Sequence, residues 1–229
     1  MKTLIISDIH ANLPAFLAVL DAAKPFQRCL FLGDAVDYGP FPEECLLYLK
    51  FHMEIGVTGN HDYAVAHNAD CGCRGDFRVA SEETRAWQRP AMTASDLDFL
   101  KGLPKTAHTF IDGVRIHLAH ASPDGDLYRY LEPSDLKELV APIDADLVLL
   151  GHTHVQYEAK IGKKLVVNPG SVGLARDGGK ACYALLVDGQ IQLKRLEYDV
   201  QRTISAILEA PLSEQTKNLL TAVLRGQRV

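Results

Sequence analysis

Residues 3–20 read Thr-Leu-Ile-Ile-Ser-Asp-Ile-His-Ala-Asn-Leu-Pro-Ala-Phe-Leu-Ala-Val-Leu, and this stretch decides the fold. Its apolar run Leu4-Ile5-Ile6 predicts a buried strand. Asn12 is a suitable helix N-cap with Pro14 in the first turn, so we expect a helix to begin there. The helix would bury apolar residues that recur at the helical period, which are Leu13, Phe16, Leu17 and Leu20. The polar residues between strand and helix therefore lie at the carboxyl end of a strand, where α/β proteins place their sites.

The same alternation continues through the first third of the chain. Residues 28–32 and 54–58 predict two further strands, and a helix is expected to open at Pro42 between them. This βαβαβ order is typical of a mainly parallel sheet.

The remaining residues predict further helices and antiparallel strands. Residues 63–104 lack strand patterning and are expected to form a small helical cap insertion. Pro211 should divide residues 199–229 into two C-terminal helices. Hairpin turns are predicted at Asp112-Gly113, Gly162-Lys163 and Asp188-Gly189. The expected fold class is α/β, with two packed mixed β-sheets flanked by helices in a single domain of residues 1–229.

Composition limits the partners of the protein. The 229 residues carry a net charge of −5 and are 47% apolar, which is ordinary globular composition. This charge gives no reason to expect a nucleic-acid-binding surface. The N-terminal apolar run is too short for a signal peptide, and no run approaches the roughly 20 residues that span a bilayer. We therefore expect a cytoplasmic protein without membrane contact, whose exposed hairpin edges could pair in a homo-oligomer.

The five cysteines are odd in number and widely spaced, so we expect reduced thiols. Cys71-Gly72-Cys73 is the one stretch that could bind a soft metal or form a redox pair. Because two further ligands are not found nearby in the sequence, ordinary reduced thiols are the favoured interpretation.

Residue types that bind metals recur after successive predicted strands. They are Asp8 and His10, Asp34, Asn60, His120, and His152 and His154. Each motif alone has an ordinary explanation, since Asn, Asp and Gly are common turn residues and a single histidine is more often structural. Together they form a mixed oxygen and nitrogen ligand set, which suits Mn, Fe, Zn, Co or Ni better than Ca or Mg. The pattern suggests a two-metal site that hydrolyses a phosphate ester.

The spacing of these residues supports a shared site. Asp8 and His10 are two residues apart at a strand end, so they can close on one cation, and His152 and His154 repeat this spacing. Asp34 has two carboxylate oxygens and could bridge two metals, while the glycine before it permits a close backbone approach.

His61 and Asp62 form a different kind of pair. A carboxylate beside a histidine can orient the imidazole and stabilise its protonated form, which suits a general acid. The two residues also fit a simple turn, because Gly59 and Asn60 precede them.

The chain resembles the calcineurin-like metallophosphoesterase superfamily over residues 8–176. The resemblance is carried by Asp8-Ile9-His10, Gly33-Asp34-Ala35-Val36-Asp37, Gly59-Asn60-His61-Asp62, His120 and Gly151-His152-Thr153-His154. It implies that one metal would bind Asp8, His10, Asp34 and His154. The other metal would bind Asp34, Asn60, His120 and His152. It also implies two divalent transition-metal ions, manganese first, with iron, nickel, zinc or cobalt as alternatives.

The resemblance further implies roles for residues around the metals. Asp34 and a hydroxide would bridge the two cations, which would clamp the phosphoryl oxygens during in-line displacement. His61 would donate a hydrogen bond or proton to the leaving-group oxygen, with Asp62 orienting it. Asp37 would act as an outer hydrogen-bond acceptor, and Arg176 is a candidate substrate contact.

Tyr38 departs from part of the family. Protein phosphatases and symmetrical dinucleoside tetraphosphatases of this superfamily place a phosphate-binding arginine at this point of the motif. The chain instead resembles the small prokaryotic phosphodiesterases, so we expect hydrolysis of a small-molecule phosphodiester. A phosphomonoesterase, a nucleotide pyrophosphohydrolase that includes dinucleoside polyphosphates among its substrates, and a non-enzymatic scaffold are the alternatives.

Overall fold

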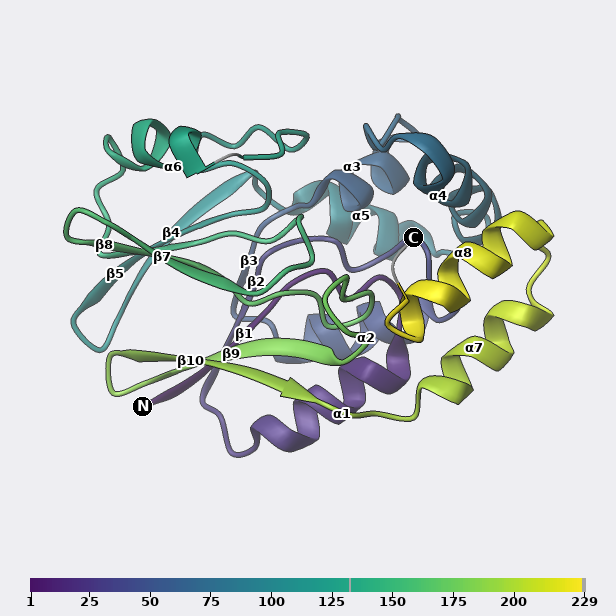
Figure 1. Cartoon of the computed structure of the whole chain (residues 1–229), viewed down its shortest axis with the longest axis horizontal. Coiled ribbons are helices and arrows are strands. Elements are labelled where there is room, and N and C mark those ends of the chain that lie inside the picture. The colour runs from purple at the N-terminus through teal and green to yellow at the C-terminus, as the bar shows by residue number, and fades with distance from the viewer. Residues whose placement is uncertain (132, 228–229) are drawn as a thin grey trace.

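A computed structural model describes residues 1–131 and 133–227 as two five-stranded sheets packed face to face, with helices on their outer sides (Figure 1). The first sheet has the order β10-β9-β1-β2-β3. Its strands are β1 (Lys2–Ile6), β2 (Arg28–Phe31), β3 (Ile55–Gly56), β9 (Ala181–Val187) and β10 (Gln190–Leu196). β1, β2 and β3 are parallel, whereas β9 and β10 run antiparallel, so the sheet is mixed.

The second sheet has the order β4-β5-β6-β8-β7 and is mixed as well. Its strands are β4 (Thr106–Ile111), β5 (Val114–Ala119), β6 (Leu147–Leu149), β7 (Tyr157–Ile161) and β8 (Lys164–Asn168). β5, β6 and β8 are parallel, and β4 and β7 are the antiparallel edges. The three predicted hairpins are confirmed. Asp112 and Gly113 both have positive φ, at 51° and 82°, as a tight primed turn requires.

The central core lies between the two sheets. Side chains alternate across a strand, so Ile5 of β1 faces the second sheet while its neighbours Leu4 and Ile6 face the helices. The core between the sheets contains Ile5, Leu30, Leu32, Ile116, Leu118, Leu147, Leu149 and Val167. This packing explains why the predicted strands are almost wholly apolar.

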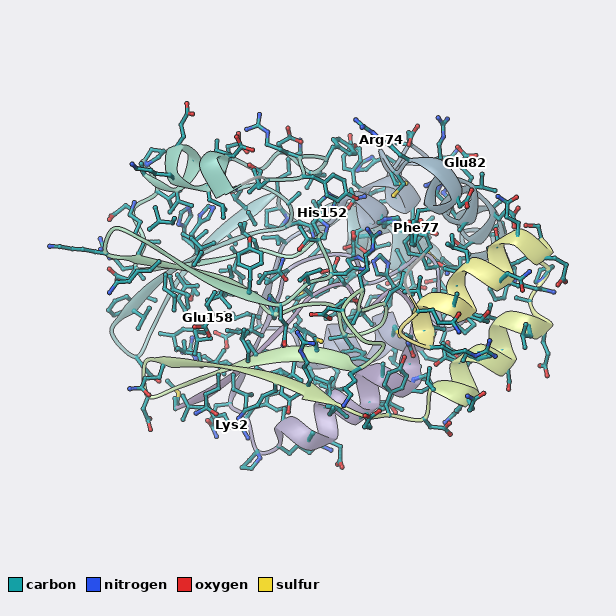
Figure 2. All side chains as sticks on the ribbon, in the orientation of Figure 1. Lys2, Arg74, Phe77, Glu82, His152 and Glu158 are labelled. Carbon is teal, nitrogen blue, oxygen red and sulfur yellow. The ribbon has the colours of Figure 1, made fainter. Side chains whose placement is uncertain are left out.

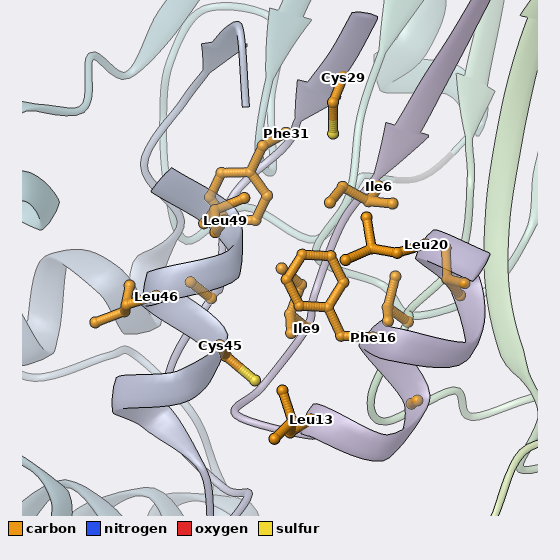
Figure 3. Packing of buried hydrophobic residues seen from close by; sticks show 14 of the residues in the cluster. Ile6, Ile9, Leu13, Phe16, Leu20, Cys29, Phe31, Cys45, Leu46 and Leu49 are labelled. Atoms are coloured by element: carbon orange, nitrogen blue, oxygen red, sulfur yellow. The ribbon is translucent and has the colours of Figure 1, made fainter. Parts of the chain in front are cut away.

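Helices α1 (Leu13–Ala23) and α2 (Pro42–His52) cover the outer face of the first sheet. Asn12 caps α1, as predicted, because its side chain accepts a hydrogen bond from the amide of Ala15. Figure 3 shows Phe16 of α1 and Leu49 of α2 packed with Phe31 of β2. The first polar turn is therefore held rigidly between a buried strand and a buried helix.

The outer face of the second sheet is covered by α6 (Pro133–Val140), which the sequence did not predict. Leu136 and Val140 of this helix pack with Val148 and Val166 of the sheet. No helix in the described part of the chain is long and apolar enough to cross a membrane.

Residues 63–104 are helical, as predicted, and form parts of three helices. These are α3 (Asn60–His67), α4 (Gly75–Gln88) and α5 (Ala94–Gly102). α3 packs against α5, and α4 packs against α8 (Glu214–Leu224). Pro211 separates α8 from α7 (Val200–Glu209), which confirms the two predicted C-terminal helices. That these residues act as a cap insertion stays a prediction.

Candidate metal centre

The residues predicted to bind metals come together at one edge, where parallel strands of both sheets end. Each side chain lies in the loop that follows a strand or at the first residue of the next helix. They are Asp8 and His10 after β1, Asp34 after β2, Asn60 after β3, His120 after β5, and His152 and His154 after β6. Both sheets therefore contribute to one site, as strand-end sites in α/β proteins do.

The backbone of this edge is unusual. Asp8, His10, Asp34, His152 and His154 all have φ between 45° and 68°, a left-handed conformation that non-glycine residues rarely adopt. Such conformations cost about 1–3 kcal/mol each and persist where the surrounding structure holds them. Here the loops are tied together by backbone hydrogen bonds, among them His10 N to Asp34 O at 3.0 Å. Strain concentrated in this way is typical of functional sites.

Gly59 shows how closely these loops approach one another. A Cβ at this position would lie 1.9 Å from Oδ1 of Asp34, so only glycine fits beside that carboxylate.

The first cluster consists of Asp8, His10, Asp34 and His154, whose ligand atoms lie within 4.8 Å of one another. The Nε2 atoms of His10 and His154 are 3.0 Å apart. Nε2 of His154 is 3.2 Å from Oδ1 of Asp8. Oδ2 of Asp34 is 3.8 Å from Nε2 of His10.

The second cluster shares Asp34 with the first. Nε2 of His120 is 3.1 Å from Oδ2 of Asp34 and 3.0 Å from Oδ1 of Asn60. Nδ1 of His152 is 3.1 Å from the same Asn60 oxygen. The structure thus groups the seven predicted ligands into the two sets that the sequence resemblance implied.

Three of these imidazoles are oriented by backbone carbonyls. Nδ1 of His10 contacts the carbonyl of Val36 at 3.1 Å, and Nδ1 of His120 contacts that of Leu32 at 2.7 Å. His154 makes the same kind of contact, at 2.8 Å, with the carbonyl of Leu174. A carbonyl only accepts, so each Nδ1 carries the proton and the lone pair of each neutral ring lies on Nε2, inside the clusters.

Two neutral Nε2 atoms that both present lone pairs cannot hydrogen-bond to each other. Yet those of His10 and His154 are 3.0 Å apart. Two ligands that lie about 2.1 Å from one cation at a right angle are about 3.0 Å apart. The spacing therefore fits a bound cation.

The carboxylates fit the same interpretation. One oxygen of each accepts a backbone amide, Oδ2 of Asp8 from His152 and Oδ1 of Asp34 from His61. Among the described residues, the remaining carboxylate oxygens are buried and accept no backbone or hydroxyl hydrogen bond. Oδ1 of Asp8 faces Nε2 of His154 at 3.2 Å, and Oδ2 of Asp34 faces Nε2 of His120 at 3.1 Å. Burying two carboxylates so close together is costly unless positive charge pairs with them, so the residues present fit divalent cations. That Asp34 bridges two metals stays a prediction.

Burial and neighbouring charges determine which groups of the two clusters are charged. Burial lowers the pKa of His10 to about 3 and that of His152 to about 3, which keeps both rings neutral. Burial alone would lower the pKa of His120 as well, but the nearby carboxylate of Asp34 raises it to about 9. Burial alone would raise the pKa of Asp8, but the neighbouring His154 lowers it to about 2. In the absence of metal the carboxylates are therefore ionised and partly neutralised by His120.

His61 is oriented by Asp37, and the prediction that Asp62 orients it is wrong. Nδ1 of His61 donates to Oδ2 of Asp37 at 2.8 Å. Asp62 instead accepts backbone amides from Asp34, Ala35 and Gly59, at 2.7, 2.8 and 3.2 Å. The reason is that α3 begins at Asn60, and adjacent residues of a helix do not face each other. Asp62 ties the Asp34 loop to the start of α3.

Asp37 accepts more than one hydrogen bond. Besides His61, the hydroxyls of Ser81 and Thr84 donate to its carboxylate. Burial would raise the pKa of Asp37, but these hydrogen bonds and the His61 charge lower it. Burial would lower the pKa of His61, but the charges of Asp34 and Cys73 and the hydrogen bond to Asp37 raise it well above its usual value, so a proton is held on this ring.

Tyr38 is buried and contributes no cation. Its ring lies 4.9 Å from that of His10 and 4.7 Å from that of His61. Its hydroxyl contacts Sγ of Cys73 at 3.3 Å and donates to the carbonyl of Phe77. Tyr38 therefore packs against the imidazoles of His10 and His61, with its hydroxyl toward Cys73 and Phe77.

A cavity of about 500 Å³ opens beside the clusters. Its wall consists of Cys73, Arg74, Phe77, Tyr128, Arg129, Tyr130 and Arg176. Tyr130 connects the cavity to the clusters, because its ring lies 4.3 Å from that of His152. Figure 2 shows Arg74 and Phe77 entering this region from the start of α4, and His152 from the loop after β6. The predicted contact Arg176 lies in this wall, with its guanidinium 4.4 Å from the Phe77 ring centre.

The sequence did not reveal Tyr128, Arg129 and Tyr130 as part of the site. They lie in an irregular segment after β5, without strand or helix patterning. Their one signal is proximity in the chain to His120, because loops after strand ends line such sites.

Comparisons with known proteins support this assignment of the fold. A family model described as the calcineurin-like phosphoesterase superfamily domain matches residues 1–188. The chain belongs to this superfamily. The phosphoesterase is 32% identical over 231 residues to the uncharacterized protein MJ0912 of Methanocaldococcus jannaschii, covering 92% of this chain and 93% of that one. It is 27% identical to phosphodiesterase YfcE of Escherichia coli K12 over 198 residues, covering 81% and 87%.

A solved structure shows the same architecture. The crystal structure of a metallophosphoesterase from Sphaerobacter thermophilus matches the phosphoesterase with a TM-score of 0.83 and 28% sequence identity, covering 97% of this chain and 98% of that one. The family resemblance and the α/β fold class expected from the sequence are thus confirmed. The phosphoesterase is a hydrolase of a metal-dependent family, and its clustered carboxylates and imidazoles are candidate ligands.

Proposed function

We propose that the protein is a dinuclear metal-dependent phosphodiesterase. The observation that carries this proposal is Oδ2 of Asp34, a buried oxygen that faces ring nitrogens of both ligand clusters, Nε2 of His10 at 3.8 Å and Nε2 of His120 at 3.1 Å. The donor set of the seven residues is mixed oxygen and nitrogen, so manganese is the first candidate metal, with iron, nickel, zinc and cobalt as alternatives. When bound, two cations at this site supply Lewis acidity and lower the pKa of an attacking water.

His61 is positioned to protonate the departing alcohol. Its Nδ1–H is held by Asp37, which leaves Nε2 as the atom that delivers a proton to the leaving-group oxygen. Asp37 and Asp34 favour the protonated ring, so the donor is charged and ready at neutral pH. Asp37 acts through His61 as a positioning residue.

The surroundings favour a diester over a monoester. A monoester dianion carries one more negative charge than a diester. The buried Tyr38 offers no positive charge to neutralise it. A diester carries a second alcohol group, which needs space beside the reacting phosphorus. The cavity lined by Phe77, Tyr128 and Tyr130 provides such space, with aromatic faces that suit an aryl or nucleoside group.

A second candidate is hydrolysis of a nucleotide or dinucleoside polyphosphate. The specific observation in its favour is the presence of Arg74, Arg129 and Arg176 in the same cavity wall. Guanidinium groups bind phosphate through paired hydrogen bonds, so a further phosphate of the substrate could bind there.

A substrate panel tests both candidates. The purified protein with manganese should cleave bis(4-nitrophenyl) phosphate faster than 4-nitrophenyl phosphate and should lose activity in chelator. Equal or faster cleavage of the monoester refutes the diesterase proposal, and preferential cleavage of a dinucleoside polyphosphate supports the second candidate. Asp34→Asn should abolish turnover and reduce the bound metal measured by elemental analysis. Full turnover by Asp34→Asn would refute the metal site itself.

The location proposed for the protein is the cytoplasm. All five cysteines are free thiols in the structure, which supports a reducing compartment.

A further inference from the structure

A second group of metal-binding side chains lies next to the ligand clusters. Nε2 of His61 and the Sγ atoms of Cys71 and Cys73 are all within 4.8 Å of one another. Sγ of Cys73 is 3.4 Å from Nε2 of His61. The sequence showed two thiols without further ligands, and the fold supplies a third ligand from the start of α3.

His61 is held in the geometry of a metal ligand. Its Nδ1–H is donated to Oδ2 of Asp37 at 2.8 Å, so Nε2 is the free ring nitrogen and is aimed at Cys73. Histidines that bind metals commonly donate their other ring nitrogen to a carboxylate in this way.

The two thiols are oriented from both sides. Sγ of Cys71 contacts the hydroxyl of Ser81 at 3.2 Å, and Sγ of Cys73 contacts that of Tyr38 at 3.3 Å. The contact with Cys71 and the charge of His61 lower the pKa of Cys73, whereas the contact with Cys73 and burial raise the pKa of Cys71, so Cys73 supplies the thiolate before a metal binds.

The loop that carries the thiols is fixed and accessible. Gly72 has a φ of 76°, and a Cβ there would lie 2.7 Å from the Tyr128 ring, so the loop packs closely on that ring. Cys71 is buried, whereas Cys73 is half-buried and lines the cavity of about 500 Å³. An ion can therefore reach the group through the cavity.

We propose that Cys71, Cys73 and His61 form a third metal site, which binds one soft divalent cation such as Zn²⁺ or Cd²⁺. Thiolate sulfur and imidazole nitrogen are the ligands that such cations prefer, and three protein ligands leave a fourth position open toward the cavity. Binding occupies Nε2 of His61, the atom that protonates the leaving group. The cation therefore inhibits hydrolysis, a consequence that rests on the proposed function.

The site is tested by titrating the manganese-loaded protein with Cd²⁺ and recording the ultraviolet thiolate-to-cadmium charge-transfer band. The proposed dinuclear site has no sulfur ligands, so the band reports the thiol site even where Cd²⁺ replaces manganese. We expect one equivalent per chain and loss of the band in Cys71→Ser and Cys73→Ser. Cys45→Ser is the matched control, because Cys45 lies on α2 with its side chain in the core, where burial raises its pKa.

Asp37→Asn should weaken cadmium binding about 10–100-fold, since it removes the hydrogen bond that orients His61. A missing band in the wild-type protein, or a band that persists in Cys73→Ser, overturns the third site without affecting the proposed function. Turnover that continues with the band fully developed supports the site and refutes the role of His61 as proton donor. Inhibition of the wild type by micromolar Zn²⁺, with resistance in Cys73→Ser, supports both the third site and the role of His61 as proton donor.

Discussion

The hydrogen bond between Asp37 and His61 predicts how the protein treats different leaving groups. Oδ2 of Asp37 lies 2.8 Å from Nδ1 of His61 and fixes the proton on that nitrogen. Asp37→Asn removes the negative charge and makes the side chain a donor as well as an acceptor. The imidazolium is then less favoured, and Nε2 is less well aimed at the leaving-group oxygen.

The magnitude follows from what the hydrogen bond does. Proton transfer by a positioned side chain contributes about 10²–10⁴ to a rate, and loss of an outer hydrogen-bond partner typically costs about 10–100-fold. We therefore expect Asp37→Asn to lower kcat about 10–100-fold for a diester with an alkyl leaving group. For a 4-nitrophenyl diester the loss should be only a few-fold, because that leaving group departs as a stable anion without needing the proton.

The assay compares kcat for both substrates in the wild type, Asp37→Asn and His61→Ala. Asp62→Asn is the control. It disturbs three backbone hydrogen bonds, so it should lower the free energy of unfolding and affect both substrates equally. Equal losses on the two substrates in Asp37→Asn would refute the assignment of Asp37 and His61 to leaving-group protonation.

Three further predictions concern stability and can be checked by thermal or urea unfolding at fixed metal concentration. Chelation should lower Tm, because a ligand at about 100 times its Kd stabilises the native state by about 2.7 kcal/mol. In a domain of this size that corresponds to a shift of roughly 5–11 °C. An unchanged Tm would contradict metal binding to the native state. Asn12→Ala should cost about 2–4 kcal/mol, because the side chain caps α1, donates to Gly173 O at 2.7 Å and accepts from Thr203 at 2.8 Å. A loss below about 0.5 kcal/mol would show that these bonds are replaced by water. Phe16→Ala should cost about 3–5 kcal/mol, because Phe16 is fully buried between α1 and the first sheet, whereas truncation of the exposed Phe51 should have little effect.

Much of the fold could be predicted because local signals and tertiary packing agree. β4 and β5 meet at the predicted turn, because Asp112 and Gly113 both have the positive φ that a tight hairpin turn requires. α6 was missed because it is only eight residues long and its apolar residues make sense only against the outer face of the second sheet. A pattern that depends on a distant sheet is not visible in its own segment.

The site was predictable in its ligands and less so in its supporting contacts. Asp8 and His10 stand directly after an apolar strand, so their position at the sheet edge follows from the chain itself. The hydrogen-bond partner of His61 does not follow from the chain itself, because it depends on where α3 begins. Asp62 is adjacent in sequence but turned away by the helix, while Asp37 arrives from a loop 24 residues earlier. Contacts between loops are set by packing, which spacing along the chain does not encode.

His61 therefore has two competing uses for a single nitrogen. Nε2 can deliver a proton to a leaving group, or it can bind a soft cation together with Cys73, and both uses need Asp37 to hold Nδ1. Asp37→Asn should accordingly weaken alkyl-diester hydrolysis and cadmium binding together, each by about 10–100-fold. Cys73→Ser should remove the cadmium response and keep the preference for leaving groups that depends on His61. If Asp37→Asn changed one property and left the other unaltered, the two functions would not share the Asp37–His61 pair, and the account of inhibition through Nε2 would fail.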